Sequence, residues 1–317
     1  MSGALWALGS GLGFGMFQAL NRRALAGMDV ALSTFLQLVV SAALLSVVSI
    51  VTEDVGLIAS APAGALLAFA LVGFIHFFVG WMLLNLGQQL IGAARTGPLL
   101  ATTPLFGAVL AAIWLGEEPG AFTIAGMAFT ITGVLVLSGE RDTVTEAPLE
   151  HDPEGDHRGP TSVATRTRNR RRAGTLAALG TAFCWALSPL FIRDGLEGLP
   201  SPLLGVTVSM VASALMFGVV LAVQRSRSGP RRVSTEALGF KVAAGLFVGV
   251  ATWFRWIALD RTTVAVVLSV NAVSVPTVLL LAPVIVGRHQ EHVTARLWFG
   301  ATLVVAGSFV LILKGSA

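Results

Sequence analysis

Two stretches of this sequence are related copies, and they decide the fold. The first is GALWALGSGLGFGMFQALNRRAL, residues 3–25, and the second is GTLAALGTAFCWALSPLFIRDGL, residues 174–196. A shift of 171 positions makes seven residues identical, among them Gly9 with Gly180 and Arg22 with Arg193. An apolar chain matches many leucines and alanines by chance, but matched glycine and arginine in the same order are harder to obtain. We therefore expect one structural unit to occur twice.

The composition indicates a chain surrounded by lipid. Of its 317 residues, 55% are hydrophobic and 12% are charged, whereas soluble domains carry roughly 25% charged residues. The mean hydropathy is +0.80. These values exclude an ordinary soluble enzyme and also a disordered protein, which requires low hydrophobicity. The single cysteine, Cys184, excludes an internal disulfide and a cysteine-based metal cluster.

The chain contains ten apolar runs that approach the length of a membrane span. A bilayer core about 30 Å thick requires roughly 20 apolar residues of helix. The runs cover residues 3–20, 30–51, 63–86, 91–114, 120–138, 174–192, 203–223, 237–259, 263–286 and 296–313. Hydrocarbon cannot hydrogen-bond a bare backbone, so each run should form a helix. Ser2 and Gly3 lie at the start of the first run, with no basic n-region, so we expect it to remain as a helix rather than to be a cleaved signal peptide.

One polar stretch, residues 139–172, separates the runs into two sets of five. It holds 14 of the chain's 38 charged residues, acidic first and basic afterwards, and it cannot bury enough apolar surface to fold alone. We predict a first five-helix repeat at 3–138, a charged linker at 139–172 and a second repeat at 174–313. Because each repeat has an odd number of spans, the second enters the membrane from the opposite side. The predicted fold is an all-α membrane protein of ten transmembrane helices in two inverted repeats, an arrangement that recurs in secondary transporters.

The ends of the two repeats carry a second set of matched residues. At a slightly larger shift the aligned pairs are Pro104/Pro276, Glu117/Glu291, Gly126/Gly300 and Gly133/Gly307. Together with the stretch GAARTGP from Gly92, this order resembles the EamA-type repeat of the drug/metabolite transporter superfamily. The resemblance implies a ten-helix carrier with a central cavity between the halves, exporting or importing small metabolites. The long linker departs from the family pattern, as does the sequence GRHQE at 287–291, where the family usually has adjacent Gly and Glu.

Basic residues are distributed unequally over the two sides of the predicted membrane. About 17 lie on the side that holds Arg22, the linker and Lys241, and about 4 lie on the other. The positive-inside rule places the first side in the cytoplasm and both termini outside, although the resemblance implies the reverse. This topology also accounts for the sequence pI near 10.5. We therefore expect the linker arginines to contact anionic lipid and not nucleic acid.

Polar side chains inside the runs are the candidates for substrate binding, because such groups usually face a cavity or a partner helix. The candidates are Gln37, His76, Trp81, Asn85, Thr102, Trp185, Asn271 and Ser274. For each of them, an interhelical hydrogen bond or simple packing is the alternative. Trp81, Asn85 and Gln88 share one face of a regular helix. That face lies roughly opposite His76, so we expect that both cannot line the cavity equally. His76 is also the one candidate for proton coupling.

Prolines mark equivalent places in the two repeats. Thr102 precedes Pro104, and Asn271 and Ser274 precede Pro276. A proline inside a helix removes a backbone hydrogen bond and frees a carbonyl. Symmetric kinks beside hydroxyl and amide groups suit a central binding site, and packing adjustment is the alternative.

The charged residues near the run ends are weaker candidates. Arg95 and Arg255 lie close enough to the ends for their side chains to reach the interface. Glu117 and Glu291 match the family pattern, and a capping or hinge-loop role is favoured for them. The glycines within 9–15 lie inside an apolar run with no strand before them, so they indicate close helix approach rather than a phosphate loop.

These features predict a secondary transporter in the cell membrane that works by alternating access around a central cavity. The expected substrates are small neutral, zwitterionic or lipophilic metabolites, because the runs lack the paired basic residues that a phosphate would need. We expect no catalytic residues, no metal site and no cofactor, and no GxxxxGK motif indicates an ATP motor. The alternatives are an intramembrane enzyme and an accessory membrane subunit without transport activity. The expected partners are a small-molecule substrate and the lipid bilayer. The sequence leaves open the direction of transport, efflux or import, and whether the protein forms a homodimer.

Overall fold

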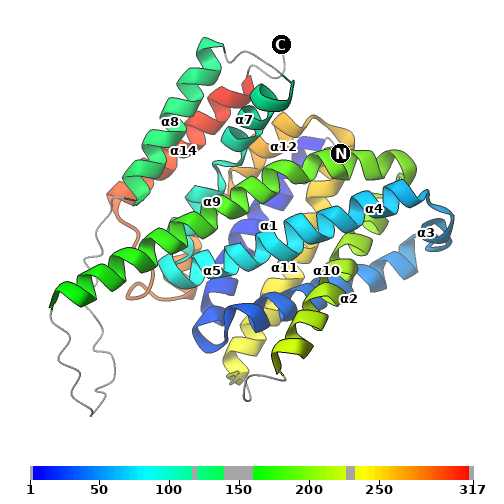
Figure 1. Cartoon of the computed structure of the whole chain (residues 1–317), viewed down its shortest axis with the longest axis horizontal. Coiled ribbons are helices and arrows are strands. Elements are labelled where there is room, and N and C mark those ends of the chain that lie inside the picture. The colour runs from blue at the N-terminus through cyan, green and yellow to red at the C-terminus, as the bar shows by residue number, and fades with distance from the viewer. Residues whose placement is uncertain (1–2, 116–119, 139–159, 226–232, 314–317) are drawn as a thin grey trace.

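The computed structural model describes residues 3–115, 120–138, 160–225 and 233–313 (Figure 1). Across these ranges the regular structure is helical, without strands. Five helices are long and apolar enough to cross a membrane: Val30–Thr52, Ala63–Ile91, Arg166–Gly198, Pro202–Val223 and Thr235–Arg261. Shorter apolar helices cover Ile124–Leu137, Ser274–Ile285 and Ala295–Val310. The prediction of a helical multi-pass membrane protein is thus confirmed, and the count of ten spans stays a prediction.

The helices follow the predicted runs closely along the chain. The first half contains α1 (Gly3–Ala24), η1 (Leu25–Gly27), α2 (Val30–Thr52), α3 (Gly56–Ser60), α4 (Ala63–Val72), η2 (Gly73–Gly80), α5 (Trp81–Ile91), α6 (Ala93–Leu100), α7 (Thr103–Leu115) and α8 (Ala121–Ser138). The second half contains α9 (Pro160–Gly198), α10 (Pro202–Arg225), α11 (Thr235–Arg261), α12 (Val264–Asn271), α13 (Ser274–Ile285) and α14 (Ala295–Leu313). Polar side chains start two of the longest helices. Asp29 accepts a hydrogen bond from the Leu32 amide, and Ser234 accepts one from the Ala237 amide.

Two runs that were predicted to be continuous helices are broken in the structure. The run 91–114 divides into α6 and α7 at residues 101–102, and the run 263–286 divides into α12 and α13 at residues 272–273. We expected Pro104 and Pro276 to kink the interior of a helix. Instead, they lie in the first turn of the second segments. A first-turn residue has no intrahelical partner for its N–H, so proline is tolerated there. Discontinuous helices at equivalent places are a feature of repeat-built transporters.

Helix α9 begins inside the stretch that we predicted to be a linker. It starts at Pro160 and runs for 39 residues, whereas the predicted span began at 174. The arginines of residues 166–170 are exposed, and arginine is a good helix former. The helix therefore extends beyond the apolar segment into a stretch of exposed, charged residues. Residues 139–159 lie outside the described part of the chain.

The surface carries large apolar side chains in a way that suits lipid contact. Several aliphatic side chains are about two-thirds exposed or more, namely Ile50, Val51, Ile113, Leu215 and Val284. Soluble monomers rarely expose contiguous apolar patches beyond a few hundred Å². Water is therefore an unsuitable solvent for this surface.

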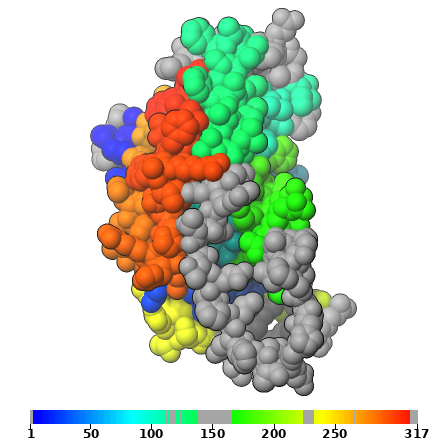
Figure 2. All heavy atoms as spheres, turned by 90° about the vertical axis from the view of Figure 1, so that its left-hand side faces the viewer, coloured from blue at the N-terminus to red at the C-terminus, as the bar shows by residue number. Residues whose placement is uncertain are grey.

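Helices from the two halves interdigitate throughout the bundle. Helix α1 packs along α11, α5 along α9, and α2 along α10. At one end of the molecule α8 and α14 lie side by side (Figures 1 and 2). A Cβ atom on Gly133 would lie 2.8 Å from the carbonyl oxygen of Gly300, and one on Gly307 would lie 2.7 Å from that of Gly126. The glycines that match between the repeats thus allow their last helices to approach closely.

Candidate functional site: a central cavity and the two ends of the bundle

A cavity lies between the two halves of the chain. A water-sized sphere can enter about 40 Å³ of it, which is room for only a few water molecules. Its walls come from α1, α6, α7, α9 and α11 to α14 and from the breaks after α6 and α12. The side chains that matter for its chemistry are Phe14, Gln18, Trp185, Arg255, Asn271 and Ser274.

Part of the cavity wall is formed by equivalent residues of the two repeats. Phe14 and Trp185 correspond at the shift of 171, and their rings meet edge to face with centroids 5.3 Å apart. Thr103 and Ser274 are the first residues of the second segments of the two broken helices, and both line the cavity. The two helix breaks therefore meet at the same place.

Arg255 is the feature of the cavity that does not follow the repeat. Its counterpart at the shift of 171 is Leu84. Arg255 is only 3% exposed, and its Cζ atom lies 6.0 Å from the centroid of the Trp185 ring. Among the described residues its Nε atom has no hydrogen-bond partner, and no carboxylate lies within 4.0 Å. The expectation that this side chain extends to the interface is wrong, because it lies inside the bundle on an aromatic ring.

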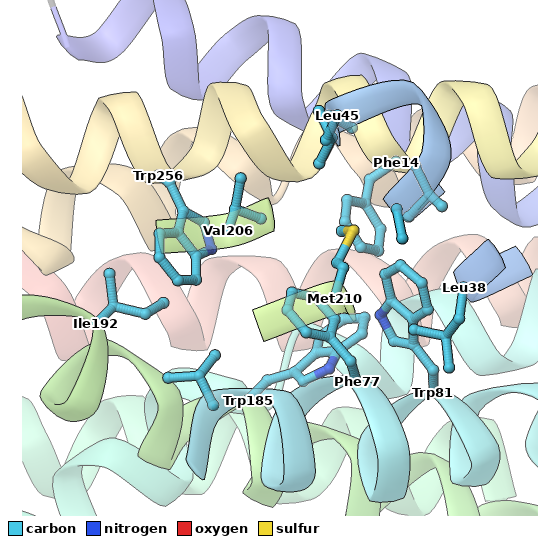
Figure 3. Packing of buried hydrophobic residues seen from close by; sticks show 14 of the residues in the cluster. Phe14, Leu38, Leu45, Phe77, Trp81, Trp185, Ile192, Val206, Met210 and Trp256 are labelled. Carbon is cyan, nitrogen blue, oxygen red and sulfur yellow. The ribbon is translucent and has the colours of Figure 1, made fainter. Parts of the chain in front are cut away.

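His76 lies in a segment whose helical geometry is unusual. Residues 73–80 form a π-helix, η2, in which hydrogen bonds run from i to i+5. His76 and Trp81 are five residues apart and are both buried, so the regular helix that would place them on opposite faces does not apply. The imidazole stacks on Trp185 with ring centroids 5.2 Å apart, and its Nδ1 lies 2.8 Å from the Ser188 hydroxyl. Figure 3 shows Trp185, Phe77, Trp81 and Phe14 in one aromatic cluster.

A network of buried amide side chains and one lysine, called the amide network below, lies next to the cavity. Its member on α1, Asn21, is about one helical turn after the cavity residue Gln18. Asn21 Nδ2 donates to Asn85 Oδ1 and to Gln88 Oε1, both at 2.6 Å. The ammonium of Lys241 donates to Asn21 Oδ1 and, at 2.8 Å, to Gln37 Oε1. All five residues are completely buried. Because Lys241 belongs to α11 and the others to the first half, the network joins the two repeats.

The end of the bundle beside this network is held by an ion pair. Arg22 Nε donates to Glu291 Oε1 at 2.8 Å, and Glu291 also accepts the amides of Ala93 and Ala94 at 3.0 Å each. Glu291 is 3% exposed. Gly92 has a φ of +81°, and a Cβ atom there would lie 2.6 Å from the Glu291 carboxylate. The sequence-based expectation of a capping role for Glu291 agrees with this geometry, in which the second half caps a helix of the first.

The opposite end of the bundle is more open. Arg193, the counterpart of Arg22, is exposed and donates to the backbone carbonyl of Thr262 at 3.4 Å. It borders a depression with about 950 Å³ of empty space, open to the outside, that Asp260 and Thr263 also line. Glu117, the sequence counterpart of Glu291, lies outside the described residues.

The structure separates the eight predicted site residues into distinct groups. Trp185, Asn271 and Ser274 line the cavity, and His76 lies behind Trp185. Gln37 and Asn85 belong to the amide network. Trp81 packs on Phe77 at 5.0 Å within the aromatic cluster. Thr102 is not among the lining residues of the cavity, and its hydroxyl donates to the Leu99 carbonyl at 2.7 Å.

Sequence reasoning missed three polar residues of these sites. Gln18 lines the cavity, and Asn21 and Lys241 carry the amide network. Lys241 was counted among the loop charges, but it is completely buried, so it is not a topology determinant. The available signal for Asn21 was a polar residue that aligns with the apolar Ile192 of the second copy.

Comparisons with known proteins place the fold and the family. Among 19 matching chains of known structure, one crystal structure covers 99% of this chain and 97% of its own, with a TM-score of 0.64 and 19% sequence identity. No curated protein sequence matches. The family model described as "EamA-like transporter family" matches residues 1–139 and 172–313.

Proposed function

The chain belongs to the EamA-like transporter family, and from this premise we propose that it is a secondary transporter that works by alternating access. The family consists of membrane transporters of the drug/metabolite transporter superfamily rather than of enzymes. The observation that carries the mechanism is the cavity between the repeats, part of whose wall is formed by equivalent residues. Substrates would be the small neutral, zwitterionic or lipophilic metabolites expected from the sequence.

In this proposal the structure corresponds to one of two states. The Arg22 end is packed and paired, and the Arg193 end borders an open depression. If the repeats exchange conformations, the Arg22–Glu291 pair opens and Arg193 pairs with Glu117 at the other end. Two states built from similar repeats have similar energies, so modest substrate binding can shift the population between them. The basic side, with Arg22, would face the cytoplasm. Removing the buried Lys241 and Arg255 from the count leaves about 16 basic residues against 3.

Transport by purified protein in sealed vesicles tests the proposal. Vesicles loaded with unlabelled metabolites should accumulate the labelled metabolite in a saturable and counter-exchangeable manner. Protein-free vesicles serve as the control. If a broad metabolite panel gives no counter-exchange, the transporter proposal is wrong, and an accessory subunit becomes the better explanation.

A further inference from the structure

We propose that the central cavity binds its substrate through a single carboxylate, and that Arg255 is the residue that anchors it. The inference rests on the proposed transport function and replaces the broad substrate range given there with one class for the same cavity, compounds that carry a single carboxylate. Its starting observation is a buried guanidinium that lines the cavity and has no described counter-charge.

A buried cation without a counter-charge is energetically unfavourable unless a negatively charged group pairs with it. Taking an ion out of water costs several kcal/mol even after relaxation, and charged groups inside membrane proteins usually face a cavity that serves a ligand or an ion. Arg255 is buried at 3% exposure, and the Trp185 ring covers it on one side. The guanidinium fork matches a carboxylate in a bidentate geometry. An incoming carboxylate would therefore supply the missing partner.

The charge of the cavity indicates one negative charge on the substrate. Arg255 is the one cation among the lining residues of the described cavity, which include no Asp or Glu. Lys241 lies 14 residues earlier on α11, which is about 21 Å along a helix, and is bonded to Asn21 and Gln37. His76 is behind Trp185 and bonded to Ser188. A phosphate dianion would thus keep one charge uncompensated.

The remaining wall favours an organic body with few polar groups. Phe14, Leu100 and Leu268 present apolar surface beside Trp185. The Thr103 and Ser308 hydroxyls donate to the backbone carbonyls of Leu100 and Ala101, so they are already engaged. Gln18 Oε1 accepts no hydrogen bond from the described residues. The substrate class is therefore a small monocarboxylate with an apolar body and at most one or two further hydrogen-bond donors.

Matched carboxylates and amides test the anchor. Purified full-length protein would be titrated with benzoate, 3-phenylpropionate and lactate, each beside its neutral primary amide, and with phenyl phosphate, while thermal unfolding is followed. The carboxylates should raise the unfolding temperature at concentrations roughly 10- to 100-fold lower than the amides do, the range for a hydrogen bond to a charged group. Phenyl phosphate should bind less well than benzoate. Equal effects of acids and amides, or no effect of any acid, would overturn the proposal.

Two variants of α11 provide the matched comparison. Arg255→Gln should remove the preference for carboxylates over amides, and Arg255→Lys should restore part of it. Arg261 lies on the same helix with its Cζ atom also 6.0 Å from a tryptophan ring, that of Trp6, but it is exposed. Arg261→Gln should therefore leave the preference unchanged. If Arg255→Gln does not fold, Arg255→Lys carries the test, because it keeps the charge without the fork and should bind carboxylates several-fold more weakly. A preference that survives Arg255→Gln would overturn the anchor.

The transport assay separates this inference from the proposed function. Saturable counter-exchange of neutral metabolites that is insensitive to carboxylate competitors would refute the Arg255 anchor and leave the transporter intact. Absence of counter-exchange with any compound would refute the transporter itself. Competition by carboxylates that disappears in Arg255→Gln, but not in Arg261→Gln, supports both.

Discussion

Two arginines that the repeat makes equivalent have different surroundings at the two ends of the bundle. Arg22 donates to the buried Glu291 at 2.8 Å and lies beside a network of buried amides. Arg193 is exposed and donates to a backbone carbonyl at 3.4 Å. Similar sequences have thus folded into a closed end and an open end. The two arginines therefore differ in their partners and exposure, although the residue is the same in both repeats.

Neighbouring residues show which differences are built into the sequence. Asn21, in the amide network, corresponds to Ile192, and Gly92 corresponds to Thr263. Gly92 adopts a backbone conformation that is almost restricted to glycine, and its missing side chain leaves room for Glu291. Thr263 accepts a hydrogen bond from the Val266 amide at 3.4 Å instead. The closed end therefore carries polar contacts that the open end does not share. If the repeats exchange conformations as proposed, the two states would differ in energy.

The largest expected effect comes from removing the carboxylate at the closed end. Glu291→Ala leaves the partly buried Arg22 and the amides of Ala93 and Ala94 without their acceptor. Breaking a buried ion pair by removing one partner costs about 3–5 kcal/mol, and the exposed part of Arg22 places the loss near 3. Thermal unfolding in detergent micelles measures it.

Glu236→Ala is the matched control for this measurement. It removes the partner of the adjacent Arg23, whose pair at 2.6 Å is more exposed. Exposed pairs contribute about 0–1 kcal/mol, so its unfolding temperature should change little. Equal losses in the two variants would show that the Arg22–Glu291 pair does not hold the closed end.

A second, smaller effect is expected from the amide network. Asn21→Leu removes the donor to Asn85 and Gln88 and one of two acceptors of Lys241. Each buried group left without its partner costs about 1–3 kcal/mol, and leucine regains part of this through apolar packing, so the net loss should be about 2 kcal/mol. Asn271→Leu is the control, because its described side-chain bond is the single contact of Ser10 at 3.2 Å. A larger loss of stability in Asn271→Leu than in Asn21→Leu would mean that the amide network is not the stronger contact between the repeats.

The arrangement of helices was largely predictable from hydropathy. Long apolar runs separated by polar residues have one solution in lipid, because each backbone group must be bonded within its own helix. The breaks at 101–102 and 272–273 were less predictable, because a proline indicates an irregularity in a helix but does not determine whether the helix kinks or ends. The π-helix at Gly73–Gly80 left no recognised signal. It nevertheless changed which side chains share a face.

Site residues that have a counterpart in the other repeat could be predicted from the sequence. Site residues without such a counterpart were missed. Trp185 and Ser274 were found because the repeat gives them counterparts or proline neighbours. Arg255 and Lys241 were read as interfacial charges, because their distance from a run end permits that position. Whether such a charged side chain is buried depends on which helix packs against it, and a single sequence does not reveal that contact.

The smallest effect on stability is expected at the open end, and it is the sharpest test of the comparison. Arg193 is exposed in this conformation, so Arg193→Glu should change the free energy of unfolding by no more than about 0.5 kcal/mol. If Arg193 pairs with Glu117 in the alternate state, the same variant should slow counter-exchange roughly fivefold, which corresponds to about 1 kcal/mol. The double variant Arg193→Glu with Glu117→Arg should restore the rate, because the pair is rebuilt with reversed charges. A double variant that is slower than either single one would mean that the two side chains never meet, and the closed end would then have no counterpart across the membrane.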